Sequence, residues 1–307
     1  MRARGGGLYK EQAMTDPTPS FPPPPPAEPA HPPEPPTASP EPPHGPPSPS
    51  VLTIRPPSAE TLLAELVVAL SYLTRLDFTL QEPPTRRVIR KSMVWFPAIG
   101  ALIGLFGASL DWITSHIALP STITATLAVV GMLWITRAIH EEELSTLVNH
   151  YGQARAQAHP LVWLQGERSV RYGTLGVVLV IILKIGILAS LNSNVLVFQA
   201  LIASCAWSRT LMVVAASWLR PVEGDPVADH FQQPPALRMM LAVALGVFVG
   251  VAVLGSAASV ALGIAAGAGL LVAIVGGYHV RGYNGPLLGT LQHVTDLSVL
   301  AVVLAIQ

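Results

Sequence analysis

Apolar segments long enough to cross a membrane follow one another along the chain from about residue 58 onward. A helix of about 20 apolar residues spans the roughly 30 Å of hydrocarbon in a bilayer. Such segments lie at residues 92–113, 121–139, 172–191, 195–219, 236–255, 258–280 and 288–306. The pattern predicts an all-α, polytopic helical membrane protein with about seven transmembrane helices in a lipid bilayer.

A weaker apolar segment precedes these, at residues 60–78. It carries the charged residues Glu60, Glu65, Arg75 and Asp77. Charges at this density are costly inside hydrocarbon. We therefore expect an N-terminal amphipathic or re-entrant helix, which lies at the membrane interface or enters the bilayer only part way.

The composition agrees with a membrane protein. Of the 307 residues, 50% are hydrophobic and only 12% are charged, whereas charged residues make up about a quarter of a typical soluble domain. The formal net charge is zero, which gives no indication of a nucleic-acid partner. The single cysteine, Cys205, excludes a disulfide framework and a Cys-X-X-Cys motif.

Proline is concentrated near the N-terminus, where residues 1–57 contain 20 of the 30 prolines. Proline has no amide hydrogen and a fixed φ, so a run of prolines forms neither a helix nor a sheet ladder. We predict a disordered, solvated tail over residues 1–57, followed by a helical transmembrane domain over residues 58–307. The tail is either a docking site for a partner that recognises proline or a linker without a defined ligand.

Lysine and arginine are confined to alternate connections between the apolar segments. The connections at 81–91, 137–171, 216–238 and 280–287 hold 11 of them, and those at 118–121, 190–195 and 255–258 hold none. Positively charged loops stay on the cytoplasmic side of a membrane. The bias predicts that the long polar loops, and with them any active face, lie in the cytoplasm.

One polar stretch, RAIHEEELSTLVNHYG at residues 137–152, follows directly on an apolar segment. If it continues the helix of that segment, Glu142, Thr146 and Asn149 share one face, and Glu143 lies on the adjacent one. Carboxylate and amide oxygens at this spacing are suited to a hard cation such as Mg²⁺. The alternative is a solvated acidic rim where a transmembrane helix leaves the bilayer.

Lys184 and Arg209 each stand inside an apolar segment. A cation at that depth is costly unless it is paired or lines a cavity, so we expect Lys184 in a functional or structural ion pair. Arg209, which follows Ser208, is a similar case. Arg168 lies in a polar connection and is suited to holding phosphate through its guanidinium group, or it serves only as part of the charge bias.

Six segments of the chain together resemble one known family. They are ALSYLTRLDF, WFPAIGALIGL, RAIHEEELSTLVNHYG, ERSVRYGTLGVVLVIILK, AWSRTLMV and GYNGPLLGT, in this order between about residues 60 and 306. Their order and spacing resemble the adenosylcobinamide-GDP ribazoletransferases, or cobalamin synthases. The resemblance implies a bacterial inner-membrane enzyme of cobalamin biosynthesis that needs Mg²⁺. Such an enzyme joins adenosylcobinamide-GDP to α-ribazole, or to its 5′-phosphate, and releases GMP.

The resemblance also implies roles for individual residues. The catalytic set is His140, Glu142 and Glu143; the metal set is Glu142, Glu143 and Asn149; and the set that binds substrate or phosphate is Arg168, Lys184, Ser208 and Arg209. In these roles the glutamates bind the metal or the pyrophosphate, and His140 is a base or an orienting partner.

The acidic positions of the family are changed in this chain. The family's pattern has three aspartates at helical spacing where this chain has Glu142, Thr146 and Asn149. An alternative function is therefore that of a catalytically degenerate homologue, which acts as a corrinoid-binding or scaffolding membrane protein. A transporter is a weaker alternative, because the sequence shows no clear internal repeat.

Overall fold

The structure, a computed structural model, describes residues 62–76, 78, 83–157 and 172–307, without the side chains of residues 153–157. The chain divides into two units, Met1–Ser48 and Pro49–Gln307, and every described residue belongs to the second unit. The predicted proline-rich tail and Arg168 lie outside the described residues. The predicted domain boundary at residues 57–58 therefore stays a prediction.

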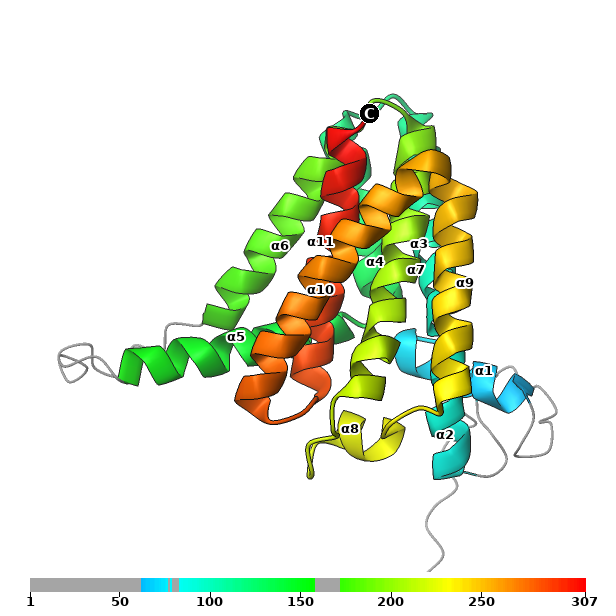
Figure 1. Cartoon of the computed structure of the whole chain (residues 1–307). Helices are drawn as coiled ribbons and strands as arrows, with labels where there is room; N and C mark the ends of the chain where they lie inside the picture. Colours follow the sequence, from blue (N-terminus) through cyan, green and yellow to red (C-terminus); the bar gives the residue numbers. More distant parts are fainter. Residues whose placement is uncertain (1–61, 77, 79–82, 158–171) are drawn as a thin grey trace, which may run out of the picture. The chain divides into compact units, whose positions relative to one another are not determined.

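Helices make up nearly all of the described chain (Figure 1). They are α1 (Leu62–Leu73), α2 (Arg86–Ser92), α3 (Phe96–Ser115), α4 (Ser121–Ile135), α5 (Ile139–Gln157), α6 (Tyr172–Ala189), α7 (Asn194–Trp218), α8 (Pro226–Phe231), α9 (Ala236–Leu254), α10 (Ala258–Val280) and α11 (Gly285–Ala305). The described residues contain no β-strand, only an isolated bridge between Pro221 and Tyr283. The all-α fold class is confirmed.

Continuous helical stretches that are long and apolar enough to cross a membrane number five in the described chain. They are Arg86–Ser115, Tyr172–Ala189, Asn194–Trp218, Ala236–Val280 and Gly285–Ala305. Counting α4 and α5 as one broken span, bent by 89°, gives six. The longest stretch contains both α9 and α10, which meet at a turn where Gly255 has a φ of 58° (Figure 1). The chain is thus a multi-pass helical membrane protein, while the predicted number of about seven spans is not confirmed.

α1 is too short to cross a bilayer by itself. Its 12 residues extend about 18 Å at about 1.5 Å per residue, against the roughly 30 Å of hydrocarbon. Its acidic residue, Glu65, is buried, and both carboxylate oxygens accept hydrogen bonds from Arg238 in α9, at 2.8 and 3.0 Å. One of the four charges that weakened this segment as a predicted span, that of Glu65, therefore has a partner inside the protein.

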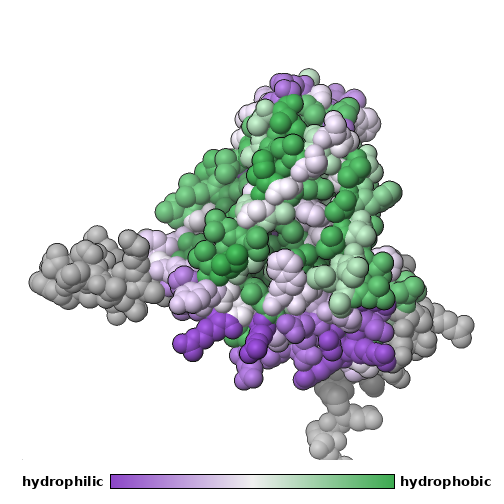
Figure 2. Space-filling view, in the orientation of Figure 1, coloured by the Kyte–Doolittle hydropathy of each residue, from purple (hydrophilic) through white to green (hydrophobic). Residues whose placement is uncertain are grey.

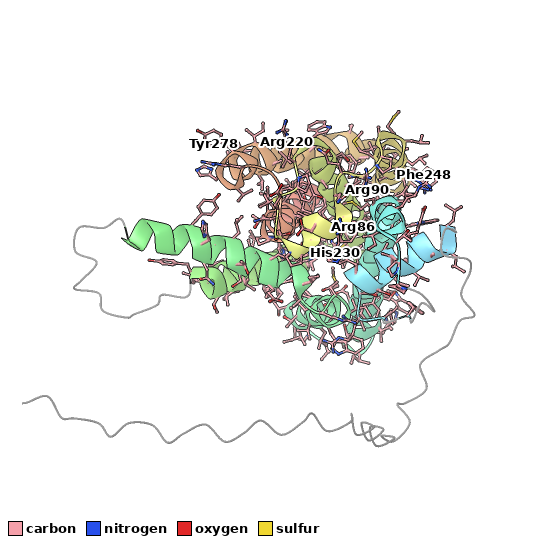
Figure 3. All side chains as sticks on the ribbon, turned by 90° about the horizontal axis from the view of Figure 1, so that it is seen from below. Arg86, Arg90, Arg220, His230, Phe248 and Tyr278 are labelled. Atoms are coloured by element: carbon pink, nitrogen blue, oxygen red, sulfur yellow. The ribbon has the colours of Figure 1, made fainter. Side chains whose placement is uncertain are left out.

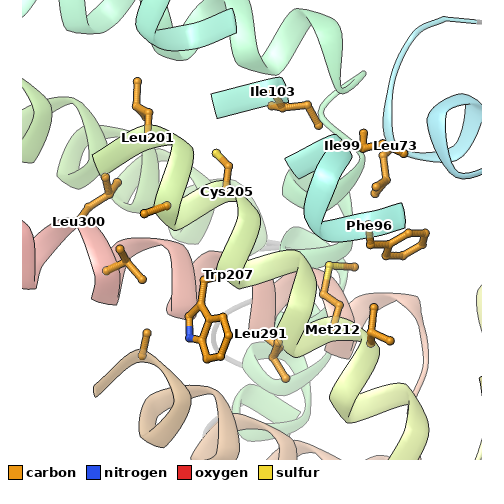
Figure 4. Packing of buried hydrophobic residues seen from close by; sticks show 14 of the residues in the cluster. Leu73, Phe96, Ile99, Ile103, Leu201, Cys205, Trp207, Met212, Leu291 and Leu300 are labelled. Atoms are coloured by element: carbon orange, nitrogen blue, oxygen red, sulfur yellow. The ribbon is translucent and has the colours of Figure 1, made fainter. Parts of the chain in front are cut away.

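α7 lies at the centre of the bundle and packs against α3, α9 and α11. Figure 4 shows part of this core, in which apolar side chains of α1, α3, α7 and α11 meet. Gly100 and Gly104 of α3 allow a close approach, because a Cβ at either position would collide with the α7 carbonyl groups of Cys205 and Leu201. Small residues matter here because lipid tails are as apolar as the side chains, so close packing holds the helices together.

The polar stretch at residues 137–152 does not extend α4, so the predicted continuation of that helix is wrong. α4 ends at Ile135, and Arg137 and Ala138 adopt left-handed conformations with φ of 56° and 52°. α5 then leaves at 89° to α4 and crosses the lower part of the bundle (Figure 1). The bend places one face of α5 against α11 and α6. A straight helix would instead carry the glutamates away from the bundle.

Hydrophilic side chains gather at one end of the described unit. In Figure 2 most of them lie along the lower edge of the face in view, with a smaller group at the top, and hydrophobic residues cover the helices between. Figure 3, which views the unit from below, shows Arg86, Arg90, Arg220 and His230 at this end. An end with several exposed cations is typical of a helical membrane protein whose Lys and Arg residues are concentrated in the loops on one side of the membrane.

Candidate active site

Glycines on the neighbouring helices allow the first turns of α5 to pack tightly into the bundle. A Cβ at Gly289 of α11 would collide with the side chain of Glu143 and would lie 3.0 Å from the carbonyl oxygen of His140. A Cβ at Gly173 of α6 would collide with Ser145. The close packing leaves His140 and Glu143 only 2% and 8% exposed.

His140 and Glu143 form a buried pair on this inner face of α5. Nδ1 of His140 lies 3.0 Å from Oε2 of Glu143. The other carboxylate oxygen, Oε1, accepts a long hydrogen bond of 3.5 Å from the hydroxyl of Tyr72 in α1. With a carboxylate beside Nδ1, a neutral imidazole carries its proton on that nitrogen and leaves Nε2 as an acceptor. Nε2 is buried and has no hydrogen-bond partner within the described chain.

Tyr72 fixes the carboxylate of Glu143 from α1, outside the membrane-spanning stretches. Its ring lies against Phe96 and Phe231, with centroid distances of 5.8 and 4.6 Å. Burial raises the pKa of the Tyr72 hydroxyl well above its ordinary value, and the negative charges of Glu143 and Asp225 raise it further. The hydroxyl therefore remains protonated and donates to the carboxylate.

A second buried pair joins α6 to α11. Nζ of Lys184 donates a hydrogen bond of 2.7 Å to Oδ2 of Asp296, and both side chains are largely hidden. The thiol of Cys205 in α7 lies 3.8 Å from the other carboxylate oxygen. The ion pair predicted for Lys184 is confirmed, and its partner is an acid of the last helix. Pairing is what makes a cation tolerable at this depth.

Several buried polar atoms near these two pairs have no hydrogen-bond partner within the described chain. They are Nε2 of His140, Oε2 of Glu141, Nε of Arg209, Oε1 of Gln292 and both ring nitrogens of His293. These five residues, together with Lys184, line one cavity of about 20 Å³, which accommodates about one water molecule. We call the six residues the polar cluster. Because buried polar atoms are normally paired, such a group is suited to binding a polar molecule.

Two contacts position side chains within the polar cluster. Nη1 of Arg209 donates to Oγ of Ser208 at 3.1 Å, and both residues are buried in α7. Nε2 of His293 in α11 lies 3.6 Å from Oε1 of Glu141 in α5, which is too long for a hydrogen bond. The structure thus brings together three residues predicted from the sequence, His140, Lys184 and Arg209, at one cavity.

The outer face of α5 is separate from the polar cluster. Glu142 and Thr146 are exposed, and the hydroxyl of Thr146 donates to the carbonyl oxygen of Glu142 at 2.9 Å. The side-chain oxygen of Asn149 accepts a hydrogen bond of 2.7 Å from the amide of Gly173, at the start of α6. The three predicted metal ligands, Glu142, Glu143 and Asn149, are therefore not brought together.

The Mg²⁺ that the resemblance implies does not fit these donors as they are arranged. Among the described residues, no group of three or more His, Cys, Asp or Glu side chains is placed to hold a metal ion. The oxygens of Glu143 are engaged by His140 and Tyr72, and the oxygen of Asn149 is engaged by a backbone amide. The metal-binding role of these residues stays a prediction.

Sequence reasoning missed Tyr72 and the pairing of Glu141 with His293. Tyr72 belongs to the weak N-terminal segment, and no local signal indicates that α1 brings its hydroxyl to α5. No local signal in the sequence indicates that Glu141 and His293 lie next to each other. Their proximity depends on how α5 packs against α11 after the bend.

The fold and the polar cluster define a multi-pass helical membrane protein with a buried polar site inside its bundle. The chain matches the cobalamin-5-phosphate synthase family over residues 65–304, and it belongs to that family. The resemblance stated from the sequence is thereby confirmed.

Several similar proteins carry the name adenosylcobinamide-GDP ribazoletransferase. That of Bradyrhizobium diazoefficiens is 28% identical over 255 residues, which cover 82% of this chain and 98% of the relative. That of Shewanella frigidimarina is 27% identical over 247 residues, and that of Shewanella sp. strain ANA-3 is 24% identical over 245 residues. These two alignments each cover 78% of this chain and 93% of the relative. No solved structure matches the chain.

Proposed function

We propose that the chain is an adenosylcobinamide-GDP ribazoletransferase. It joins adenosylcobinamide-GDP to α-ribazole, or to its 5′-phosphate, and gives adenosylcobalamin, or its 5′-phosphate, and GMP. The family and the names of the relatives support this reaction. The observation that assigns this reaction to particular residues is the buried pair of His140 and Glu143. The second ring nitrogen of His140 has no hydrogen-bond partner within the described chain, and His140 lines a polar cavity.

The proposed reaction replaces one bond to phosphorus by another. A hydroxyl of the ribazole attacks the phosphorus bonded to the cobinamide arm, and the bond from that phosphorus to the bridging oxygen breaks. GMP leaves with the bridging oxygen, and the proton of the attacking hydroxyl is transferred to Nε2 of His140. Glu143, held by Tyr72, orients the imidazole and stabilises the imidazolium that forms.

Phosphoryl transfer also needs positive charge near the departing phosphate. Arg209 supplies this charge in the proposal. Its Nε has no hydrogen-bond partner within the described chain, and its Nη1 donates to the hydroxyl of Ser208, which holds the guanidinium group. Lys184 is engaged by Asp296 and acts by fixing α6 against α11 beside the cavity. Arg168, in the polar connection before α6, is proposed as a further phosphate ligand.

Three further parts of the proposal rest on the sequence. The need for Mg²⁺ rests on the resemblance, and chelation in the activity assay tests it. The location of the active face in the cytoplasm, at a bacterial inner membrane, rests on the alternation of charged loops. A partner of the proline-rich tail rests on composition alone.

The proposal is tested with the full chain, purified in detergent and reconstituted in phosphatidylcholine vesicles. Adenosylcobinamide-GDP and α-ribazole 5′-phosphate are supplied with Mg²⁺, and GMP and the coupled corrinoid are quantified by liquid chromatography with mass spectrometry. We expect the two products in equal amounts and no GMP when the ribazole is omitted. Release of GMP without ribazole would indicate hydrolysis and contradict the proposal.

The same chain also tests the alternative of a degenerate homologue. A strain that lacks cobalamin synthase is supplied with cobinamide and given either the wild-type chain or His140→Asn at equal membrane levels. Growth that is restored by the wild-type chain but not by His140→Asn supports the transfer reaction. If neither chain restores growth and the purified wild-type chain binds the corrinoid without turnover, the degenerate homologue is favoured.

A further inference from the structure

An apolar groove opens between α9 and α10, on helices that do not contribute to the polar cluster. The two helices meet at the Gly255–Ala257 turn, but α9 packs mainly on α7 and α10 mainly on α11. Two cavities of about 400 and about 470 Å³ lie along them. Both are lined by Trp207 of α7 and Ala266 of α10, so they form one groove, which we call the lipid groove.

Small residues keep the lipid groove open. Gly267 lines one half and Gly263 the other, and a Cβ at either position would have no atom within 4 Å. The indole N–H of Trp207 donates to the carbonyl oxygen of Leu262 at 3.1 Å. The one polar atom of that side chain is therefore satisfied within the protein, and its ring offers only apolar surface to the groove. An apolar groove of this kind suits a hydrocarbon chain, because a polar ligand would lose its hydrogen bonds there.

Two arginines stand near one end of the lipid groove. Trp218 lines the groove at the end of α7, and Arg220 follows two residues later. The carbonyl oxygen of Arg220 accepts a hydrogen bond of 2.8 Å from the amide of Tyr283, so Arg281 lies in the turn that adjoins it. Both arginines are exposed, and neither has an ion pair within the described chain.

Exposed aromatic side chains lie at the same end. Tyr278 is 82% exposed and Trp218 is 65% exposed. Because Trp and Tyr concentrate where hydrocarbon meets the headgroups, the arginines stand at headgroup level and the groove runs from there into the hydrocarbon.

We propose that the lipid groove binds one anionic phospholipid. An acyl chain lies between α9 and α10 against Trp207, and the phosphate group binds Arg220 and Arg281. In the half nearest the arginines, the lining residues of α10 run from Ala266 to Ala273. That segment is about 10 Å long at about 1.5 Å per residue, which fits within the roughly 15 Å of one hydrocarbon leaflet. The site does not depend on the transfer reaction.

The groove suits a lipid chain better than a helix of a second copy, because it is apolar along its length and ends near two exposed arginines. The positive charge at its end adds a headgroup preference, because phosphate binds well to the forked guanidinium group of arginine.

The test measures lipid binding by the full chain. The protein is delipidated in a mild detergent and then exposed to phosphatidylglycerol or to phosphatidylcholine with the same acyl chains. Retained lipid is counted by native mass spectrometry, and the melting temperature is followed in parallel. We expect several-fold more phosphatidylglycerol than phosphatidylcholine to be retained, with a higher melting temperature in phosphatidylglycerol.

Two glycine-to-leucine variants distinguish lipid binding in the groove from lipid binding on the rest of the lipid-facing surface. Gly267→Leu fills the groove without a clash, because the position is open. Gly186→Leu in α6 is the control, since that helical glycine is equally open but does not line the groove. We expect Gly267→Leu to lose phosphatidylglycerol several-fold and Gly186→Leu to retain it. The double variant Arg220→Gln and Arg281→Gln should still bind lipid but lose the headgroup preference.

Three results would overturn the proposal. Equal retention by Gly267→Leu and Gly186→Leu would remove the groove as the binding site. A headgroup preference that persists in the arginine variant would remove the assigned phosphate contacts. A change of oligomeric state in Gly267→Leu, but not in Gly186→Leu, would identify the groove as an interface between copies of the chain.

Discussion

The two faces of α5 carry similar residues in opposite surroundings. On the inner face, His140 and Glu143 are buried and joined at 3.0 Å. On the outer face, Glu142 and Thr146 are exposed, and the Thr146 hydroxyl bonds only to its own helix. Glu142 and Glu143 are neighbours in sequence, yet successive residues point about 100° apart around a helix. The bend at residues 137–138, rather than the number of acids, therefore decides which glutamate is buried in the bundle.

The two faces also differ in how their polar atoms affect the stability of the protein. A buried polar atom without a partner is destabilising, whereas an exposed one is solvated by water. The polar cluster contains such atoms on Glu141, Arg209 and His293, while the outer face of α5 is open to solvent. Buried, incompletely paired polar groups of this kind are concentrated at functional sites. The comparison therefore favours the inner face as the site of chemistry.

The largest effect is expected on replacing His140 by asparagine. The variant keeps a polar group beside Glu143 but removes the proton acceptor, so transfer should fall about 10²- to 10⁴-fold. Initial rates of GMP release from reconstituted protein measure this loss, and binding of adenosylcobinamide-GDP should persist. Rates within a few-fold of the wild type would exclude His140 as the base and weaken the distinction between the two faces.

Lys184→Met tests whether the polar cluster depends on its second ion pair. Without the lysine, Asp296 loses its ion-pair partner inside the protein, and we expect a loss of about 3 kcal/mol in stability. This value is at the lower end of the losses that follow the removal of one partner of a buried ion pair, because the lysine side chain is still 11% exposed. Denaturant titration in detergent measures the change.

The matched variant for this pair combines Lys184→Met with Asp296→Asn. Removing the remaining charge should restore part of the lost stability, because an amide costs less to bury than an unpaired carboxylate. A double variant that is no more stable than Lys184→Met would show that the buried charge is not the cause of the loss.

The smallest effect is expected at Asn149. Asn149→Ala removes the hydrogen bond to the amide of Gly173, which should lower stability by about 1 kcal/mol and leave transfer unchanged. Thr146→Ala, on the outer face, is the control and should change neither quantity. If Asn149→Ala abolishes transfer while stability is preserved, the metal-binding role predicted from the sequence is favoured over the structural one.

The general fold could be predicted from the sequence because the signals are strong and local. Apolar segments of about 20 residues specify membrane helices whatever their neighbours are. The need of Lys184 for a partner follows from its depth alone, and the structure supplies Asp296. The family could also be recognised, because its segments keep their order along the chain.

The arrangement of the candidate site could not be predicted in the same way. The bend depends on left-handed conformations at Arg137 and Ala138, and neither residue is a glycine that would indicate one. Tyr72 reaches Glu143 only through the packing of α1 on the rest of the bundle. Contacts of this kind depend on residues far apart in the sequence, so helical periodicity does not reveal them.

The most direct test compares Glu143→Gln with Glu142→Gln in the same vesicles. The substitutions replace a carboxyl group by an amide at adjacent positions of α5 and preserve the size of the side chain. We expect Glu143→Gln to lower the rate of transfer about 100-fold, because the imidazole loses its carboxyl partner, and Glu142→Gln to lower it less than about tenfold. Equal losses in both variants would contradict this prediction, and a larger loss in Glu142→Gln would place the chemistry on the outer face of the helix.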